Sequence, residues 1–163
     1  MEIRKATPGD LESIAEVFRK CWTISYIDIL PKQVREEMSV ENAREMWKAA
    51  VAPNPDRETF VIVEDGNVVG MARVGADEEN TSRGHLFSLY ISPESAGKGF
   101  GRALLRVVLN SLKERGFTRF SLWVFKDNPT ARALYESEGF VITGAEKIDP
   151  RWKIPQIEMA TVK

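Results

Sequence analysis

The sequence predicts an α/β fold in which a mixed sheet carries helices on both of its faces. Short runs of β-branched and aromatic residues alternate along the chain with longer runs whose apolar residues recur at the helical period. Some neighbouring strands are joined by a tight turn, which makes them antiparallel, and others by a helix, which allows a parallel pair. The 163 residues suit one ordinary domain, so we expect a single domain over residues 1–163.

Seven strands are expected from these runs, and the clearest pair is a hairpin. Its turn, Asp65-Gly66-Asn67, separates two β-branched runs and has the residues that tight hairpin turns require. A central strand is rich in aromatic and β-branched residues and is closed by Pro93. The expected strands are residues 3–6, 60–63, 68–74, 86–91, 120–124, 140–142 and 157–162.

Five helical segments occupy much of the remaining chain. Thr7 as N-cap and Pro8 in the first turn open the first helix, whose apolar face runs to Trp22. The stretch that follows, up to Pro31, is less regular and unusually aromatic. Gly116 suits the C-terminal end of the central helix. The other helical segments and the central helix are expected at residues 31–38, 39–51, 129–138 and 102–115.

The composition excludes several classes of function. The charges nearly balance, with a formal net charge of −1 at pH 7, which argues against a binder of nucleic acid or of membrane surfaces. Cys21 is the only cysteine, so an internal disulfide and a cysteine-based zinc site are excluded, and we expect no metal. We expect a soluble, cytoplasmic protein, because the first residues form no apolar signal segment and no run reaches membrane-spanning length.

Three glycines in alternate positions lie between the strand at residues 86–91 and the central helix. They leave successive backbone N–H groups uncovered next to a helix N-terminus, where free amides and the helix dipole favour an anion. We therefore expect a phosphate-carrying ligand on this turn; the alternative is a tight connection that merely needs positive φ angles. The spacing fits neither the nucleotide-triphosphate loop nor the dinucleotide fingerprint. The residues expected to bind the ligand here are Gly97, Lys98, Gly99, Gly101 and Arg102.

Two segments together resemble the signature of the Gcn5-related N-acetyltransferase (GNAT) family. Residues 89–105 resemble the family's acyl-CoA-binding segment, and residues 128–140, from Asn-Pro-Thr-Ala-Arg to Glu-Gly-Phe, resemble the second half of its signature. Ala96 stands where the family usually has Arg or Gln, which removes a side chain but leaves the backbone amides of the turn. The resemblance covers nearly the whole chain. It implies a mostly antiparallel, twisted, V-shaped sheet of about seven strands, split between the fourth and fifth.

The resemblance also implies an activity. It indicates an N-acetyltransferase that moves an acetyl group from acetyl-CoA to a primary amine, either of a small molecule or of a peptide N-terminus. A non-catalytic acyl-CoA-binding regulator on the same fold is the alternative, and Ala96 is its only support. A homodimer is compatible with the resemblance as well, because many relatives pair through edge strands.

Particular residues receive roles from the resemblance. Backbone groups of Leu89, Tyr90 and Ile91 would pair with the pantetheine arm of the cofactor as if it were another strand. Asn128 would contact the same region and also serve as the N-cap of the following helix. Tyr135 lies at the position of the family's general acid and would protonate the leaving thiolate. The alternative for Tyr135 is a core aromatic, since it shares one helical face with other apolar residues.

His85 and Cys21 are single occurrences of reactive residue types. Aligned by the loop motif, His85 falls where some family members carry a base-acting glutamate. An imidazole pKa of about 6.5 suits taking a proton from an ammonium, directly or through water; an exposed histidine after a polar loop is the alternative. Cys21 has no histidine near it in the sequence and is expected to pack in the core or line the pocket. This expectation favours direct transfer in a ternary complex over an acyl-enzyme.

The acceptor pocket is expected, by analogy with the family, between the first two helices and the last two strands. Its candidate residues are Trp22, Tyr26, Ile29 and Leu30, with Trp152 from the late loop, and plain packing is the alternative for each. Asp28 could hold an ammonium group. An aromatic wall would admit an apolar amine or stack against a cation.

Overall fold

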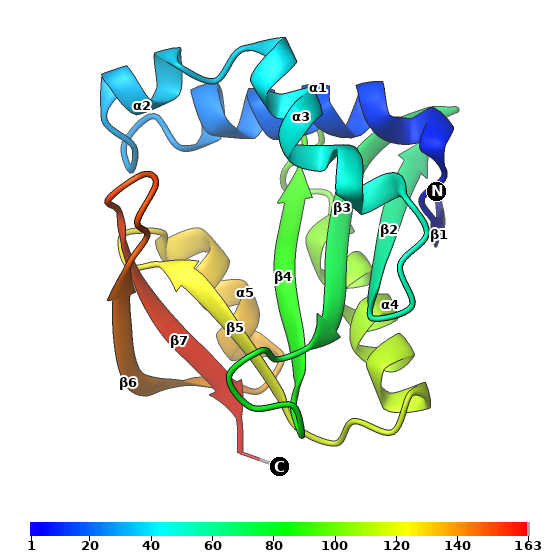
Figure 1. Ribbon diagram of the computed structural model, residues 1–163, viewed down its shortest axis with the longest axis vertical. Coiled ribbons are helices and arrows are strands. Elements are labelled where there is room, and N and C mark those ends of the chain that lie inside the picture. Colours follow the sequence, from blue (N-terminus) through cyan, green and yellow to red (C-terminus); the bar gives the residue numbers. More distant parts are fainter. Residues whose placement is uncertain (163) are drawn as a thin grey trace.

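The computed structural model describes residues 1–162, in which seven strands form one sheet with the order β1-β2-β3-β4-β5-β7-β6. Neighbouring strands are antiparallel except for the parallel pair β4 and β5. The mixed, mostly antiparallel sheet of seven strands is therefore confirmed (Figure 1). The strands are β1 (Glu2–Lys5), β2 (Arg57–Glu64), β3 (Asn67–Ala76), β4 (Gly84–Ile91), β5 (Phe120–Phe125), β6 (Phe140–Ile148) and β7 (Pro155–Thr161).

Helices cover both faces of this sheet. The first group, α1, α2 and α3, lies across the top of Figure 1, and α4 and α5 lie behind the strands. Successive residues of β2 show why both faces are covered: Phe60 and Ile62 pack in the core under α4, whereas Val61 packs in the core under α1. The helices are α1 (Leu11–Lys20), α2 (Lys32–Glu36), α3 (Val40–Val51), α4 (Phe100–Glu114) and α5 (Pro129–Ser137).

The sheet splits between β4 and β5. These strands pair only at their first residues, from Gly84 opposite Phe120 to Leu86 opposite Leu122. Beyond Leu86 the strands diverge: β4 runs up toward α1, and β5 runs toward the left of Figure 1. A register shift between β3 and β4 leaves Phe87 without a partner at the start of the divergence. The predicted V-shaped split between the fourth and fifth strands is confirmed.

Some elements differ from the sequence-based expectation. β6 extends to Ile148, whereas the apolar run predicts an end at Ile142. The extension contains Gly144, which has a positive φ angle, and the β6–β7 register shifts beyond Ile142. The irregular stretch after α1 begins with a π-helical turn, η2 (Cys21–Ser25), in which Tyr26 N–H donates to the Cys21 carbonyl at 3.0 Å.

One edge of the sheet is formed by β6, whose apolar side chains Val141, Ile142 and Ile148 are exposed. An exposed edge strand is a surface through which two chains could pair. The homodimer stays a prediction.

Candidate active site

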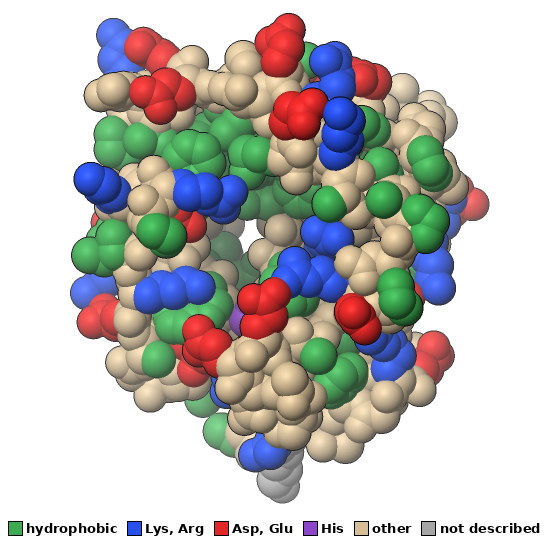
Figure 2. Space-filling model, in the orientation of Figure 1, with side chains coloured by type: hydrophobic (Ala, Val, Ile, Leu, Met, Phe, Trp, Pro, Cys, Tyr) green, Lys and Arg blue, Asp and Glu red, His purple; other side chains and the backbone are tan. Residues whose placement is uncertain are grey.

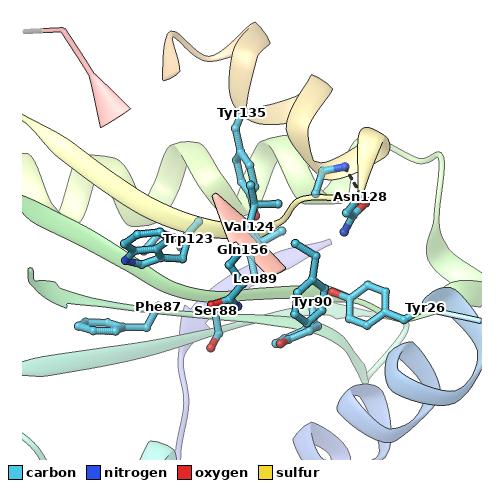
Figure 3. Close-up of a pocket in the computed structure, with 13 residues that line it drawn as sticks. Tyr26, Phe87, Ser88, Leu89, Tyr90, Trp123, Val124, Asn128, Tyr135 and Gln156 are labelled. Carbon is cyan, nitrogen blue, oxygen red and sulfur yellow. Dashed lines mark hydrogen bonds between the residues drawn. The ribbon is translucent and has the colours of Figure 1, made fainter. Parts of the chain in front are cut away.

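Two pockets meet at the diverging parts of β4 and β5. The first, called here the split pocket, lies between these strands and has a volume of about 90 Å³ (Figure 3). All three tyrosines of the chain line it. Its lining residues are Tyr26, Leu86, Phe87, Ser88, Leu89, Tyr90, Trp123, Val124, Phe125, Asn128, Ala131, Tyr135 and Gln156.

The second pocket, called here the aromatic pocket, has a volume of about 250 Å³ and is lined by all four tryptophans of the chain. His85 lines it as well, and Figure 2 shows that purple side chain at the lower edge of a hollow near the centre of this face. Both pockets share one wall, so that a ligand in one would touch residues of the other. The shared residues are Phe87, Ser88, Tyr90, Trp123, Phe125 and Gln156.

The edge of β4 that faces the split pocket presents backbone groups that no neighbouring strand pairs with, although the Ile91 carbonyl accepts a hydrogen bond from the Cys21 thiol. Ser92 N–H donates to the Val69 carbonyl at 2.8 Å, on the β3 side. Backbone groups alternate in direction along a strand, so Leu89 and Ile91 direct their N–H and C=O groups away from β3 and toward the split. Tyr90 faces β3 with its backbone and offers its ring to both pockets. The register therefore narrows the predicted main-chain contacts with a pantetheine arm to Leu89 and Ile91.

The glycine turn is an open cradle before α4. Gly97 and Gly99 have φ angles of +79° and +80°, and a Cβ added at either would meet no atom within 4 Å. Ala103 N–H donates to the Gly99 carbonyl at 3.1 Å, which is the first helical bond of α4. The preceding amides, of residues 97–102, have no backbone acceptor among residues 1–162. Free amides at a helix N-terminus fit the diphosphate of coenzyme A.

The two cations of the turn already have carboxylate partners. Lys98 Nζ lies 3.1 Å from Glu64 Oε1, and Arg102 Nε lies 3.1 Å from Glu138 Oε1. Gly101 lies in the first turn of α4, where an added Cβ would lie 3.5 Å from a Leu134 methyl group. A bound phosphate would compete with the carboxylates for Lys98 and Arg102, whereas the backbone amides are free.

Helix α5 brings Asn128 and Tyr135 to the split pocket. Asn128 Oδ1 accepts a hydrogen bond from Ala131 N–H at 3.2 Å, so its predicted N-cap role is confirmed. Tyr135 points from α5 into the split, toward Leu89 and Val124 (Figure 3). Burial raises the pKa of the Tyr135 phenol, which therefore keeps its proton at neutral pH. The side chain belongs to the core and to the pocket at once.

His85 is buried in β4, so the alternative of an exposed histidine is wrong. Its Nδ1 lies 2.8 Å from Ser121 Oγ. Burial lowers the pKa of the imidazole to about 4; the Asp77 carboxylate opposes this shift, and the nearby cations Lys147 and Arg83 add to it. His85 is therefore neutral at pH 7.

The predicted acceptor residues separate in the structure. Trp22 lines the aromatic pocket together with Trp152, and Tyr26 lines the split pocket. Leu30 is buried in the core under α1, Ile29 packs against that core, and neither lines the split pocket or the aromatic pocket. Asp28 is exposed and also lies outside both.

Three charged residues of the aromatic pocket were not predicted as site residues: Lys147, Asp149 and Arg151. The Lys147 ammonium lies 4.3 Å from the centre of the Trp123 ring. The Asp149 carboxylate accepts hydrogen bonds from the backbone N–H groups of Arg151 and Trp152 at 2.8 and 2.9 Å. Their signal in the sequence is the run of charges just before Trp152, with Lys147 at the end of β6 and Asp149 and Arg151 in the late loop.

Cys21 is buried, and its thiol donates a hydrogen bond to the Ile91 carbonyl at 3.1 Å. Burial raises the pKa of this thiol to about 12, so the thiolate needed for an acyl-enzyme is scarce. The structure thus agrees with Cys21 as a packing residue.

Comparison with known proteins decides the family. The model of the acetyltransferase (GNAT) family matches residues 11–140. The chain belongs to this family. It is 28% identical over 131 residues to an uncharacterized N-acetyltransferase, YuaI, of Bacillus subtilis, which covers 78% of this chain and 73% of the relative. It is also 26% identical over 155 residues to a spermidine N(1)-acetyltransferase of Thermoplasma acidophilum, covering 91% and 93%.

A solved structure shows the same fold. The PaiA N-acetyltransferase of Thermoplasma acidophilum, in complex with coenzyme A, has a TM-score of 0.72 and 23% identity, covering 98% of this chain and 97% of that one. This member of the GNAT family is thus an acyl-CoA-dependent N-acetyltransferase, as the signature segments predict. No helix in residues 1–162 is long and apolar enough to cross a membrane.

Proposed function

We propose that this chain transfers the acetyl group of acetyl-CoA directly to a primary amine in the aromatic pocket, with both substrates bound at once. The observation that carries the proposal is the wall shared by the two pockets, because it lets a thioester and an amine meet without a covalent enzyme intermediate. The raised pKa of the buried Cys21 thiol supports the same route.

Acetyl-CoA supplies the acetyl group as an activated thioester, and several groups of the chain would hold it. The free amides of residues 97–102 would bind the diphosphate. Leu89 and Ile91 would pair with the pantetheine arm, and one of their N–H groups would polarise the thioester carbonyl. Asn128 would add its side-chain NH2 group, because the side-chain oxygen already caps α5.

Tyr135 is the proposed proton donor. The amine nitrogen forms a bond to the acetyl carbon, the carbon–sulfur bond breaks, and the thiolate receives a proton. A thiol has a pKa of about 8.5 and a free phenol about 10, and burial raises that of Tyr135 further. The phenol therefore acts first as a hydrogen-bond donor to the developing thiolate, and proton transfer completes as the thiol forms.

His85 is the proposed acceptor of the amine's proton. The imidazole is neutral at pH 7 and lines the aromatic pocket. It lies four residues before Leu89 on β4, a separation of about 13 Å along an extended strand. We therefore expect the proton to reach His85 through water.

The lining of the aromatic pocket favours one class of amine. Its walls are mainly aromatic, and with His85 neutral its charged side chains are two cations, Lys147 and Arg151, and one carboxylate, Asp149. We therefore expect a monoamine with an apolar or aromatic body, free or at a peptide N-terminus, to react better than a polyamine.

Thiol release from acetyl-CoA tests this function. Phenethylamine, peptides with a free N-terminus and spermidine form the amine panel, and calorimetry with acetyl-CoA gives binding independently. Turnover with a monoamine supports the proposal. Binding of acetyl-CoA without turnover on any amine favours the acyl-CoA-binding regulator, for which Ala96 in the loop motif is the specific observation.

The Tyr135→Phe variant tests the proton donor. The ring that packs in the core remains, so the melting temperature and acetyl-CoA affinity should stay near those of the wild type. The turnover number should fall by about 10²-fold or more, because general acid catalysis typically contributes that much. An unchanged turnover number would remove Tyr135 from the mechanism.

A further inference from the structure

A polar cluster is buried at the closed end of the split, where β4, β5 and β7 meet. Asp77, His85, Ser121 and Glu158 are each less than one tenth exposed. Asp77 follows the end of β3, and parallel pairing places Ser121 directly opposite His85. The proposed transfer uses only His85 from this cluster, so the other buried groups need an explanation.

The hydrogen bonds of the cluster fix where its protons lie. Ser121 Oγ lies 2.6 Å from Asp77 Oδ2, which also accepts from Arg83 at 2.7 Å. Hydrogen bonds from its neighbours lower the pKa of Asp77 despite burial, so it is a carboxylate and can only accept. The single hydroxyl hydrogen of Ser121 therefore points to Asp77, and His85 Nδ1, 2.8 Å from Ser121 Oγ, must donate. Neutral His85 then carries its proton on Nδ1.

The other ring nitrogen is open to the site. Among residues 1–162, the buried side-chain nitrogens that lack a hydrogen-bond partner are Trp47 Nε1, Arg73 Nε and Arg83 Nε. His85 Nε2 also makes no hydrogen bond, yet it is not one of these buried atoms, so it reaches a pocket surface. His85 lines the aromatic pocket and also a separate cavity of about 300 Å³, whose other lining residues include Glu78 and Glu79.

We propose that Asp77 and Ser121 are positioning residues, which hold His85 in its Nδ1-protonated form so that the Nε2 lone pair takes the proton released by the acceptor amine. The proposal rests on the function proposed above. The N–H bond of the attacking amine breaks, the proton passes through water to Nε2, and the imidazolium keeps its Nδ1–H bond to Ser121. The proton then leaves Nε2 for solvent through the cavity lined by Glu78 and Glu79, which restores neutral His85.

Charged groups from several elements face His85 and set its basicity. Asp77, after β3, and Glu158, on β7, favour the imidazolium, whereas Arg83, before β4, and Lys147, on β6, oppose it. The cavity shared with His85 adds Arg57 from β2, and Glu78 and Glu79 from the loop after β3. A pH profile of any variant must be interpreted against this set.

A purely structural cluster is the competing explanation, and the single histidine of the chain allows a direct test. In protein labelled with ¹⁵N-histidine, Nε2 couples to both ring carbon-bound protons and Nδ1 mainly to one, so the protonated nitrogen can be assigned. For the wild type at pH 7 we expect the proton on Nδ1. A wild-type spectrum with the proton on Nε2 overturns the proposal, and this measurement needs neither a variant nor turnover.

Two variants separate positioning from packing. Ser121→Ala removes the acceptor of Nδ1–H, so we expect Nε2-protonated His85 to appear and kcat/KM to fall by about 10- to 100-fold. Thr143→Val is the matched control, because Thr143 donates to Glu158 at 2.9 Å, in the same cluster, without contacting Ser121 or His85. The control should keep the wild-type tautomer and the wild-type kcat/KM.

The outcomes distinguish failure of this inference from failure of the proposed function. A wild-type tautomer in Ser121→Ala, or an unchanged kcat/KM despite a changed tautomer, overturns the positioning role. Absence of turnover on every amine overturns the proposed function and with it the catalytic use of the cluster, while the spectrum still decides whether Ser121 sets the tautomer. If the Ser121→Ala variant fails to fold, the wild-type spectrum and the Asp77→Asn variant decide. We expect Asp77→Asn to lower kcat/KM as well as the melting temperature of the acetyl-CoA complex, and a change in melting temperature alone would contradict the positioning role.

Discussion

At the scale of single residues, His85 shows how opposing effects set the chemistry of one group. Burial has the largest effect on its pKa and disfavours the charged form. The Asp77 carboxylate favours the charged form, and the Lys147 ammonium disfavours it. The resulting pKa of about 4 keeps the imidazole neutral and able to accept a proton, but also makes it a weak base. Any change that removes a neighbouring cation should therefore strengthen the base.

The Lys147→Gln substitution tests this balance. Because the Lys147 ammonium disfavours a second positive charge, its removal should raise the pKa of His85 above about 4. A ¹⁵N titration of the single histidine measures the pKa directly. Lys126→Gln is the control, since Lys126 is paired with Glu146 and is not among the charges that act on His85. A pKa that stays the same or falls in Lys147→Gln contradicts the prediction.

The partners of His85 could not be found from the sequence. Asp77 is 8 positions away, across the loop between two strands, and Ser121 is 36 away, so neither lies in the same element as His85 and local periodicity does not connect them. Only the parallel register of β4 and β5 brings Ser121 opposite His85. A serine inside the apolar strand Phe-Ser-Leu-Trp-Val was the single local hint. Tyr135 and Asn128, by contrast, lie in a local motif and were found from it.

At the scale of elements, the turn before α4 shows what a local signal can predict. The alternating glycines, the positive φ angles and the free amides belong to one short segment, so long-range packing was not needed to identify them. The extension of β6 shows the opposite case. Its last residues pair with β7 across a register shift at Gly144, and tertiary pairing overrides a sequence without strand alternation.

The Gly99→Ala substitution should weaken acetyl-CoA binding. Gly99 has a φ angle of +80° and an added Cβ would meet no atom within 4 Å, so the strain is conformational and costs about 1–2 kcal/mol. Gly66→Ala is a matched control, with the same φ angle and the same open space in the β2–β3 turn. Both variants should lose similar stability in urea denaturation, but only Gly99→Ala should lose affinity in calorimetry. Equal affinity in both variants would count against the cradle.

The Asn128→Asp substitution separates the two roles of the α5 N-cap. A carboxylate also accepts the hydrogen bond from Ala131 N–H and favours the helix N-terminus, so stability should stay within about 0.5 kcal/mol of the wild type. The side-chain NH2 group is lost, and we expect a KM for acetyl-CoA raised several-fold. Asn128→Ala, which removes the cap, should lower the free energy of unfolding by about 1 kcal/mol. An Asn128→Asp enzyme with the wild-type KM would restrict Asn128 to capping.

At the scale of the whole molecule, the V-shaped sheet creates the site. Two cores, one under α1 and α3 and one under α4 and α5, cover the two faces of the sheet, and β4 and β5 separate beyond Leu86. The separation exposes the backbone of Leu89 and Ile91 and places both pockets against one wall. The family signature predicts this shape, but the acceptor side is formed by η2, α3, β6 and the late loop, whose packing no local motif specifies.

The buried histidine should make the stability of the whole molecule depend on pH. The pKa of His85 is about 4 in the folded chain and 6.5 in the unfolded chain. Between these pH values the unfolded chain binds a proton that the folded chain does not bind. Stability is therefore greatest above pH 6.5 and should fall by roughly 2 kcal/mol between pH 7 and pH 5. The Asp10 carboxylate, whose pKa is lowered to about 2, affects stability only below about pH 4, where it is protonated when unfolded.

The His85→Gln variant isolates this contribution, because the chain has no other histidine. Urea denaturation of the wild type should give a clearly lower free energy of unfolding at pH 5 than at pH 7, and the variant should lose little over the same range. At pH 7 the imidazole is mostly neutral in both states, so a difference there mainly reports packing and the lost bond to Ser121. Equal losses in wild type and variant between pH 7 and pH 5 would mean that the pKa of His85 is not lowered in the folded chain, which contradicts the prediction.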